Sequence, residues 1–188
     1  MPFISTEIPG LLVFEPKVFV DSRGYFFESY NEKLFQQQGI DCRFVQDNQS
    51  SSTYGVIRGL HYQLNPHAQI KLVRVLAGRI LDVAVDVRNG SPTYGRYFSI
   101  ELSSENKRQL FIPKGFAHGF SVLSERAEVL YKCDGFYNKE SEGGFRFDDP
   151  SLNIDWQIPA DRAIISDKDT ILPFLEAIKT NFAYQDQQ

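Results

Sequence analysis

Turn-forming residues interrupt this chain at short intervals, and this spacing limits its fold more than any other feature. The intervals are roughly eight to twelve residues, which is typical of all-β sandwiches and barrels rather than of βαβ units. The segments between the turns have strand-like patterns: 71–76, 81–87, 97–102 and 129–132. The turns themselves fall at 77–78, 89–92, 103–106 and 113–115. Eight or more short antiparallel strands predict a mainly β jelly roll with its core between two sheets.

The chain before this region has a mixed pattern. Three short hairpin strands are predicted, at 11–14, 18–20 and 25–30. Asn31 is a typical N-cap residue, and we expect it to begin a short helix that runs through Gln38. Gly39 is expected to end this helix in a left-handed conformation.

The pattern weakens after residue 135. Residues 138–155 are polar and rich in glycine, and we expect a loop that borders the ligand. A last strand is predicted at 163–165. From Thr170, with Pro173 in the first turn, a helix is predicted to cover the mouth of the barrel, on the spacing of Ile171, Leu175 and Ile178. The tail, 185–188, is expected to fray.

Composition limits the class of protein. At 188 residues, with 42% hydrophobic and 23% charged residues, the chain suits one globular domain spanning 1–188. It has no signal-peptide pattern and no apolar run of roughly 20 residues, so we expect a cytoplasmic protein. A net charge of −4 without a basic cluster argues against nucleic-acid binding. Cys42 and Cys133 form no metal-binding or disulfide pattern and are expected to be buried thiols.

Two segments, 55–78 and 113–118, resemble the sequence motifs of the cupin superfamily of jelly-roll proteins. Metal-binding cupins supply His-x-His and a Glu from the first motif and one more His from the second. Gln63 replaces the second His, Lys71 stands in place of the Glu, and no residue in 55–78 is acidic. The two matching positions are His61 and His118. His67, the third histidine, has the context of an exposed loop tip. An ammonium group repels a cation, so we predict no metal.

Without a metal, a His and a Lys that face one cavity suit proton abstraction next to a carbonyl group. His61 could take the proton near neutral pH, and Lys71 could stabilise the enolate oxygen that develops. Such a base works best beside a carboxylate that fixes its tautomer. The spacing leaves four candidates open: Asp82, Asp86, Asp167 and Asp169. A purely structural strand histidine, and a solvated strand face for Asp82 and Asp86, are the alternatives.

Longer blocks of sequence resemble one family. Together they closely resemble the dTDP-4-dehydrorhamnose 3,5-epimerases, in order from about Ile8 to Asp169, and the blocks are 21–28, 45–48, 56–63, 71–74, 82–86, 90–95, 112–120, 131–133 and 166–169. The resemblance implies a cupin-type homodimer that uses no metal or cofactor. It also implies that the substrate is dTDP-4-dehydro-6-deoxy-D-glucose, in dTDP-L-rhamnose synthesis.

The resemblance further implies a role for individual residues. His61 matches the family's base, Asp169 the carboxylate that orients it, Tyr131 the acid on the opposite face of the sugar, and Lys71 the residue at the C4 oxygen. From its residue type alone, Tyr131 would be a core or rim aromatic. Both C3 and C5 flank the C4 ketone, so one base and one acid could invert both centres through the same enolate.

Binding positions carry over in the same way. Arg58, His118 and Lys168 match sugar and phosphate contacts, and Gln46 and Asn48 match residues near the nucleotide. Residues that would reach the nucleotide from the partner subunit are Arg23 and Glu28. Aromatic residues that could stack on the ligand, or equally pack in the core, are Phe19, Phe26 and Tyr137. Glu142 falls where the family has a binding Glu, although 138–139 and 145–150 depart from the family pattern.

Three other functions are kept open. The presence of Tyr131 favours inversion at both carbons, but relatives exist that epimerise only C3 or C5 of other deoxysugars. A non-catalytic cupin that senses a nucleotide-sugar would be expected to lack His61, Lys71 or Asp169, and all three are present. A metal-dependent cupin oxygenase or isomerase would require bound iron, zinc or manganese.

Overall fold

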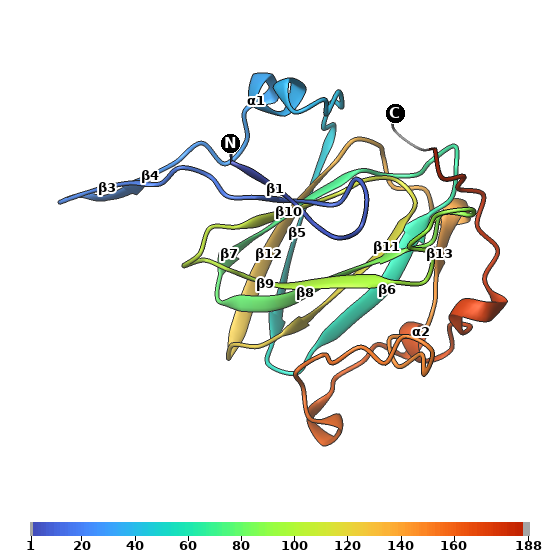
Figure 1. The fold of residues 1–188 in the computed structure, drawn as a ribbon. Coiled ribbons are helices and arrows are strands. Elements are labelled where there is room, and N and C mark those ends of the chain that lie inside the picture. Colours follow the sequence, from blue (N-terminus) through green and yellow to red (C-terminus); the bar gives the residue numbers. More distant parts are fainter. Residues whose placement is uncertain (1, 186–188) are drawn as a thin grey trace.

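The computed structural model describes residues 2–185, and two antiparallel sheets make up most of it (Figure 1). The first sheet has the order β1 (Phe3–Ser5), β2 (Leu12–Phe14), β10 (Gln109–Ile112), β7 (Lys71–Ala77), β12 (Arg126–Cys133) and β5 (Gln46–Thr53). The second has the order β13 (Glu142–Gly144), β6 (Ile57–Gln63), β11 (Phe116–Val122), β8 (Arg79–Asp86) and β9 (Tyr97–Ser103). The predicted jelly roll is therefore confirmed.

Strand β8 shows where the two hydrophobic cores lie. Ile80 and Ala84 face the core between the sheets, whereas Leu81, Val83 and Val85 belong to a second core. This second core is completed by residues from the C-terminal third of the chain: Phe145, Leu152, Trp156, Leu175 and Phe182. Both faces of β8 are thus covered, and its alternating pattern does not give it a solvated face.

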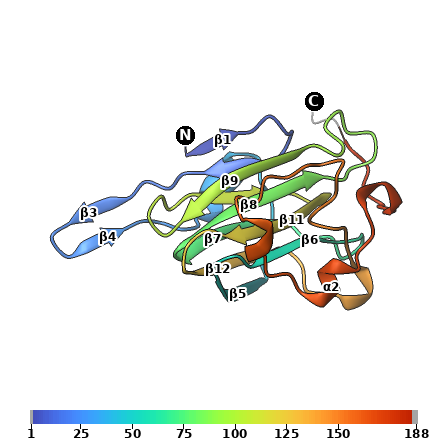
Figure 2. The same ribbon diagram turned by 90° about the horizontal axis from the view of Figure 1, so that it is seen from below.

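A two-stranded hairpin, β3 (Phe19–Asp21) and β4 (Gly24–Phe26), forms an arm that extends from one end of the sandwich in Figures 1 and 2. Its apolar side chains are unusually exposed: Phe19 53%, Val20 78%, Tyr25 60% and Phe26 67%. The arm adds nothing to the cores of its own chain.

The short helix predicted after the arm is present as α1 (Glu32–Gln37). The side chain of Asn31 accepts a hydrogen bond from the backbone N–H of Leu34, as an N-cap does. Gly39 has a φ of 83°, which confirms the left-handed end of the helix. Phe35 anchors the helix in a small aromatic cluster against the first sheet.

The helix predicted from Thr170 is wrong. The structure instead has an α-helix, α2 (Asp167–Thr170), that ends there, followed by a 3₁₀ turn, η3 (Leu175–Ala177). Pro173 disfavours helical backbone at the residue before it, and Asp149 Oδ2 accepts the N–H of Leu175 at 2.6 Å. This segment is therefore held in an irregular path along the second sheet. Residues 186–188 of the predicted frayed tail lie outside the described residues.

Two further differences concern the loops. The expected loop at 138–155 contains a 3₁₀ turn, η1 (Lys139–Ser141), and β13, which pairs with β6. The expected strand at 163–165 is reduced to a single parallel bridge between Val56 and Ile164, after the 3₁₀ turn η2 (Ala160–Arg162). In the part of the chain that the structure describes, no helix has the length and apolarity needed to span a bilayer.

Candidate active site

A cavity of about 520 Å³ opens between the two sheets, which is within the size range of small-molecule sites. A second cavity of about 330 Å³ adjoins it. Three residues line both cavities: His61, Lys71 and Tyr131. These three side chains therefore stand where the two spaces meet.

An irregularity in β6 puts two functional side chains on the same wall. His61 pairs with His118 and Arg58 pairs with Phe120, so three steps along β6 match two along β11. This extra residue is a β-bulge, and it turns both Arg58 and His61 toward the cavity although they are an odd number of residues apart. The backbones of β6 and β11 are packed closely at this bulge, because a Cβ on Gly119 would come within 2.6 Å of the carbonyl oxygen of Arg58.

His61 is joined to Asp169 by a 2.6 Å contact between Nε2 and Oδ1. Asp169 lies on α2, beside β6, where the hydroxyl of Ser166 caps the helix and accepts the N–H of Asp169. Burial alone would raise the pKa of Asp169, but its hydrogen bonds to His61, Ser166 and the backbone of Gly59 hold that pKa below its ordinary value. The ionised carboxylate fixes the imidazole through Nε2 and leaves Nδ1 as the other ring nitrogen.

Tyr131 and Lys71 come from the opposite sheet, on β12 and β7. The Lys71 ammonium lies 5.7 Å from the centre of the Tyr131 ring. Burial raises the pKa of Tyr131, so the phenol keeps its proton well into the alkaline range. Burial has the opposite effect on Lys71 and lowers the pKa of its ammonium. The cavity thus has a histidine on one wall and a protonated phenol on the other.

His118 does not share the carboxylate of His61 but has its own. Its Nε2 lies 2.7 Å from Oδ1 of Asp82 on β8, and both side chains are buried. Asp86, on the same strand, is also fully buried and accepts hydrogen bonds from Arg88, Ser91 and Thr93. The solvated face considered for Asp82 and Asp86 is therefore wrong. Of the four carboxylates left open by the spacing, Asp169 is the one beside His61.

Polar side chains from five strands, β5, β6, β7, β12 and β13, and from the loops beside them line the second cavity. Gln46 and Asn48 on β5 are joined by a 2.9 Å hydrogen bond, and Gln46 also accepts the backbone N–H of Tyr137 at 3.1 Å. Glu142 accepts hydrogen bonds from Lys168 at 2.6 Å and from the Tyr137 hydroxyl at 3.1 Å. These two donors hold the pKa of Glu142 below its ordinary value despite its partial burial.

The residues that break the cupin metal pattern have other contacts. Gln63 donates to the backbone oxygen of His67 at 2.7 Å and accepts the N–H of Asn138 at 2.7 Å, so it ties two loops together. His67 is exposed. Among residues 2–185, no three His, Cys, Asp or Glu side chains are grouped so that they could hold a metal ion.

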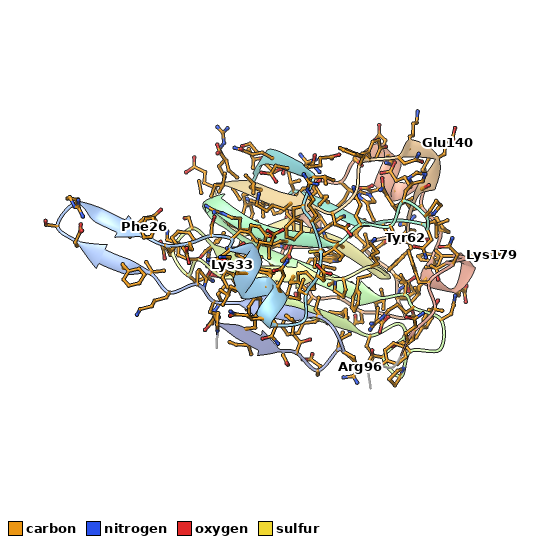
Figure 3. The ribbon with its side chains drawn as sticks, turned by 90° about the horizontal axis from the view of Figure 1, so that it is seen from above. Phe26, Lys33, Tyr62, Arg96, Glu140 and Lys179 are labelled. Carbon is orange, nitrogen blue, oxygen red and sulfur yellow. The ribbon has the colours of Figure 1, made fainter. Side chains whose placement is uncertain are left out.

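Four of the predicted binding residues lie outside both cavities of this chain. Arg23, Phe19 and Phe26 belong to the arm, and Arg23 pairs with Asp21 on the hairpin turn at 2.6 Å. Glu28 follows the arm and contacts Asn31. In Figure 3, Phe26 lies at one end of the molecule and Glu140, close to Glu142 in sequence, lies at the other. The arm does not reach its own chain's cavity.

The structure also adds residues that the sequence reasoning missed. Ser52 accepts a 3.1 Å hydrogen bond from Arg58, and Ser50 lines the first cavity. Both lie an even number of residues from Gln46 and Asn48 on β5, so all four side chains point to the same face of the strand. This alternation could have identified Ser50 and Ser52 from the sequence. Apolar residues also line this cavity: Val56, Ile57, Phe120, Ile164 and Ile165.

Known proteins can now be compared with this geometry. The model of the family described as dTDP-4-dehydrorhamnose 3,5-epimerase matches residues 5–177. The chain belongs to this family. A dTDP-4-dehydrorhamnose 3,5-epimerase of Shigella flexneri is 56% identical over 170 residues, which cover 90% of this chain and 93% of that protein.

Two solved structures of family members show the same fold. The epimerase of Legionella pneumophila, in complex with dTDP-4-keto-L-rhamnose, is 49% identical, with a TM-score of 0.93 over 97% of this chain and 98% of that one. A 3'-monoepimerase from Streptomyces bikiniensis, in complex with dTDP-quinovose, is 33% identical, with a TM-score of 0.85 over 91% and 86%. The cupin-type fold therefore carries both double and single epimerisation.

Proposed function

We propose that this protein inverts C3 and C5 of dTDP-4-dehydro-6-deoxy-D-glucose and so makes dTDP-4-dehydro-L-rhamnose for dTDP-L-rhamnose synthesis. One observation carries this proposal: the His61–Asp169 pair and the Tyr131 phenol come from opposite sheets and line the same cavity. A base and an acid on opposite walls are what inversion of a carbon next to a ketone requires.

The proposed steps use only groups of this chain and the substrate. His61 Nδ1 takes the proton from C3 or C5, and the C–H electron pair moves into the enolate, whose negative charge develops on the C4 oxygen. The Lys71 ammonium stabilises that oxygen, and Asp169 steadies the imidazolium. Tyr131 then donates its proton to the same carbon from the other face, and both groups exchange protons with solvent before the second centre reacts. No cofactor is proposed, because the C4 ketone itself acidifies both protons.

The polar cavity next to the catalytic residues is the proposed nucleotide site. Gln46, Asn48 and Glu142 offer hydrogen bonds to a base or a sugar, and the Tyr137 ring is 57% exposed and free to stack on the base. Arg58, His118 and Lys168 are proposed to hold the sugar and the diphosphate, since guanidinium and ammonium groups suit phosphate oxygens.

We also propose a homodimer in which the arm completes the partner's nucleotide site with Arg23, Glu28, Phe19 and Phe26. The apolar side chains of the arm are exposed, and no residue of the arm lines either cavity of its own chain. Strand β5, which carries the proposed nucleotide contacts, is the last strand of its sheet, so an added strand can pair with its free edge.

Co-expression tests the shared site. Arg23→Ala should raise KM with little change in kcat, and His61→Asn should remove exchange. A mixed dimer of the two variants has one site with intact His61 and an intact arm from the other chain. That site should restore the wild-type KM, and a mixture that keeps the raised KM would show that each arm serves its own chain.

We further propose that residues 1–188 form one cytoplasmic domain. Strand β8 contributes to both hydrophobic cores, which joins them into one folding unit. Cys42 and Cys133 are both free thiols, which suits a reducing compartment.

Deuterium exchange is the decisive experiment for the activity. Incubation with dTDP-4-dehydro-6-deoxy-D-glucose in deuterated water should place deuterium at both C3 and C5. Label at one centre alone would favour the single-centre epimerases, of which the Streptomyces bikiniensis relative is an example. No label at either centre would contradict the proposal and favour a nucleotide-sugar-binding role.

A further inference from the structure

Asp82 is a buried carboxylate with half of its hydrogen-bonding capacity unused. It lies on β8, with 0% of the residue exposed, and its Oδ1 contacts His118 Nε2 at 2.7 Å. Its Oδ2 is the one buried side-chain nitrogen or oxygen atom within residues 2–185 that has no hydrogen-bond partner. Because buried polar atoms are normally paired, this orphan oxygen calls for a functional explanation.

His118 is the direct partner of Asp82 and lines the larger cavity. Its Nε2 is taken by Asp82, and no hydrogen bond joins its Nδ1 to any described residue. Within residues 2–185, Nδ1 is not one of the buried side-chain atoms that lack a hydrogen-bond partner. Since it has no partner, it must be accessible. It is therefore the ring nitrogen that remains for a ligand in the cavity.

Lys71 is a second cation influenced by Asp82. No hydrogen bond or ion pair of its ammonium occurs within the described part of the chain, and its burial lowers its pKa. The charges that oppose this effect are those of Cys133, Asp82 and Glu142. Burial raises the pKa of Cys133 to about 11, so its thiol is neutral at physiological pH. Asp82 and Glu142 are therefore the two carboxylates whose charges favour the Lys71 ammonium.

We propose that Asp82 is a positioning residue for the epimerisation, which holds His118 as an imidazolium with its Nδ1–H directed at a substrate oxygen. The inference rests on the proposed function for its substrate. A buried carboxylate beside a neutral imidazole would be an uncompensated charge, whereas the imidazolium–carboxylate pair is neutral as a whole. The substrate then meets a cationic donor whose balancing charge lies behind it, out of the substrate's reach.

Asp86 provides a matched comparison for Asp82. It lies on the same strand and the same face, it is equally buried, and its oxygens accept hydrogen bonds from Arg88, Ser91 and Thr93. Neither carboxylate lines the two cavities itself, but His118, the partner of Asp82, lines the larger one, whereas no partner of Asp86 lines either. Asp86 has the contacts of a structural carboxylate, and a change there should affect folding alone.

The kinetic test compares Asp82→Asn with Asp86→Asn. Asp82→Asn should lower kcat for deuterium exchange by about 100-fold, as the loss of one preorganised donor does, with little change in the affinity for dTDP. Asp86→Asn should lower the melting temperature and leave kcat per folded molecule at the wild-type value. The proposal is overturned if Asp82→Asn has wild-type kcat, or if its loss is accounted for by a lower melting temperature alone.

A spectroscopic test does not depend on activity, and its decisive reading is made on the wild-type protein. The sequence has three histidines, so ¹⁵N-histidine labelling gives three rings, which His67→Gln and His61→Asn assign. Near neutral pH, His118 in the wild-type protein should carry hydrogen on both ring nitrogens, and in Asp82→Asn on one. A neutral His118 in the wild type would overturn the inference. Absence of exchange in the wild type with a protonated His118 would instead remove the proposed function and leave the Asp82–His118 pair supported.

Discussion

Two His–Asp pairs each present their imidazole to the larger cavity, and they differ in exposure and in the elements that carry them. In the His61–Asp169 pair the imidazole is 30% exposed, and the carboxylate comes from a short helix outside the sheet. In the His118–Asp82 pair the side chains are 7% and 0% exposed, and both belong to neighbouring strands of the second sheet. The open pair is placed to exchange a proton, and the enclosed pair is placed to hold one.

The surroundings of the two carboxylates explain this difference. Asp169 has several hydrogen-bond donors, His61, Ser166 and the backbone of Gly59, so its negative charge is satisfied whether or not the imidazole is charged. Asp82 has one partner and one orphan oxygen. His118 is therefore the one group in direct contact that can balance the charge of Asp82, and this is why we propose it as a fixed donor rather than as the base.

The largest expected effect separates the two histidines. His61→Asn should lower exchange at C3 and C5 by about 10⁴-fold, at the upper end for loss of a general base, with dTDP affinity retained. His118→Asn should lower it by about 100-fold, as loss of a donor does. Exchange followed by NMR in deuterated water measures both, and equal losses would remove the distinction between the pairs.

The next effect concerns the orienting carboxylate. Asp169→Asn should favour the wrong tautomer of His61 and lower kcat by about 10³-fold, within the range seen when such a carboxylate becomes an amide. The exposed Asp167 on the same helix gives a matched control, and Asp167→Asn should keep wild-type kcat. Exchange rates of the two variants, measured at equal folded fraction, check this. Wild-type kcat in Asp169→Asn would show that His61 needs no carboxylate.

A smaller effect is expected from the acid opposite His61. Tyr131→Phe should lower formation of the inverted product by about 100-fold, because it removes one general acid. Exchange should be better preserved, since His61 can return deuterium to the face from which it took the proton. NMR analysis of label and of configuration in the same sample distinguishes the two processes, and exchange that falls as far as inversion would contradict the assigned role.

The smallest effect is a shift with pH. Burial lowers the pKa of Lys71 from 10.5, so its ammonium is lost as pH rises through that lowered value, whereas burial raises the pKa of the Tyr131 phenol from 10.0. Activity should therefore fall on the alkaline side with the titration of Lys71. Lys71→Arg should extend the plateau to higher pH, because a guanidinium stays protonated. A pH profile of kcat that is unchanged in Lys71→Arg but altered in Tyr131→Phe would reverse the assignment.

Several elements could be predicted from local sequence because their patterns are local. The predicted strands at 71–76, 81–87, 97–102 and 129–132 correspond to β7, β8, β9 and β12 with small shifts at their ends. Strand β5 was not predicted, since Gln46–Thr53 is entirely polar. It is an edge strand, and one of its faces lines the polar cavity. Neither the edge of a sheet nor a polar cavity favours apolar side chains. The polar residues that we propose as nucleotide contacts are therefore also the reason that β5 has no hydrophobic signal.

The sequence by itself determined the two-sheet architecture, through its turn spacing and strand periodicity, and it set His61 and Lys71 in strands next to broken metal positions. Only the tertiary structure decided which carboxylate meets which histidine. Asp169 lies 108 residues from His61, and Asp82 lies 36 residues from His118. Such contacts depend on strand register, on one bulge in β6 and on where a short helix packs. The alternation of apolar and polar residues along a strand encodes none of these.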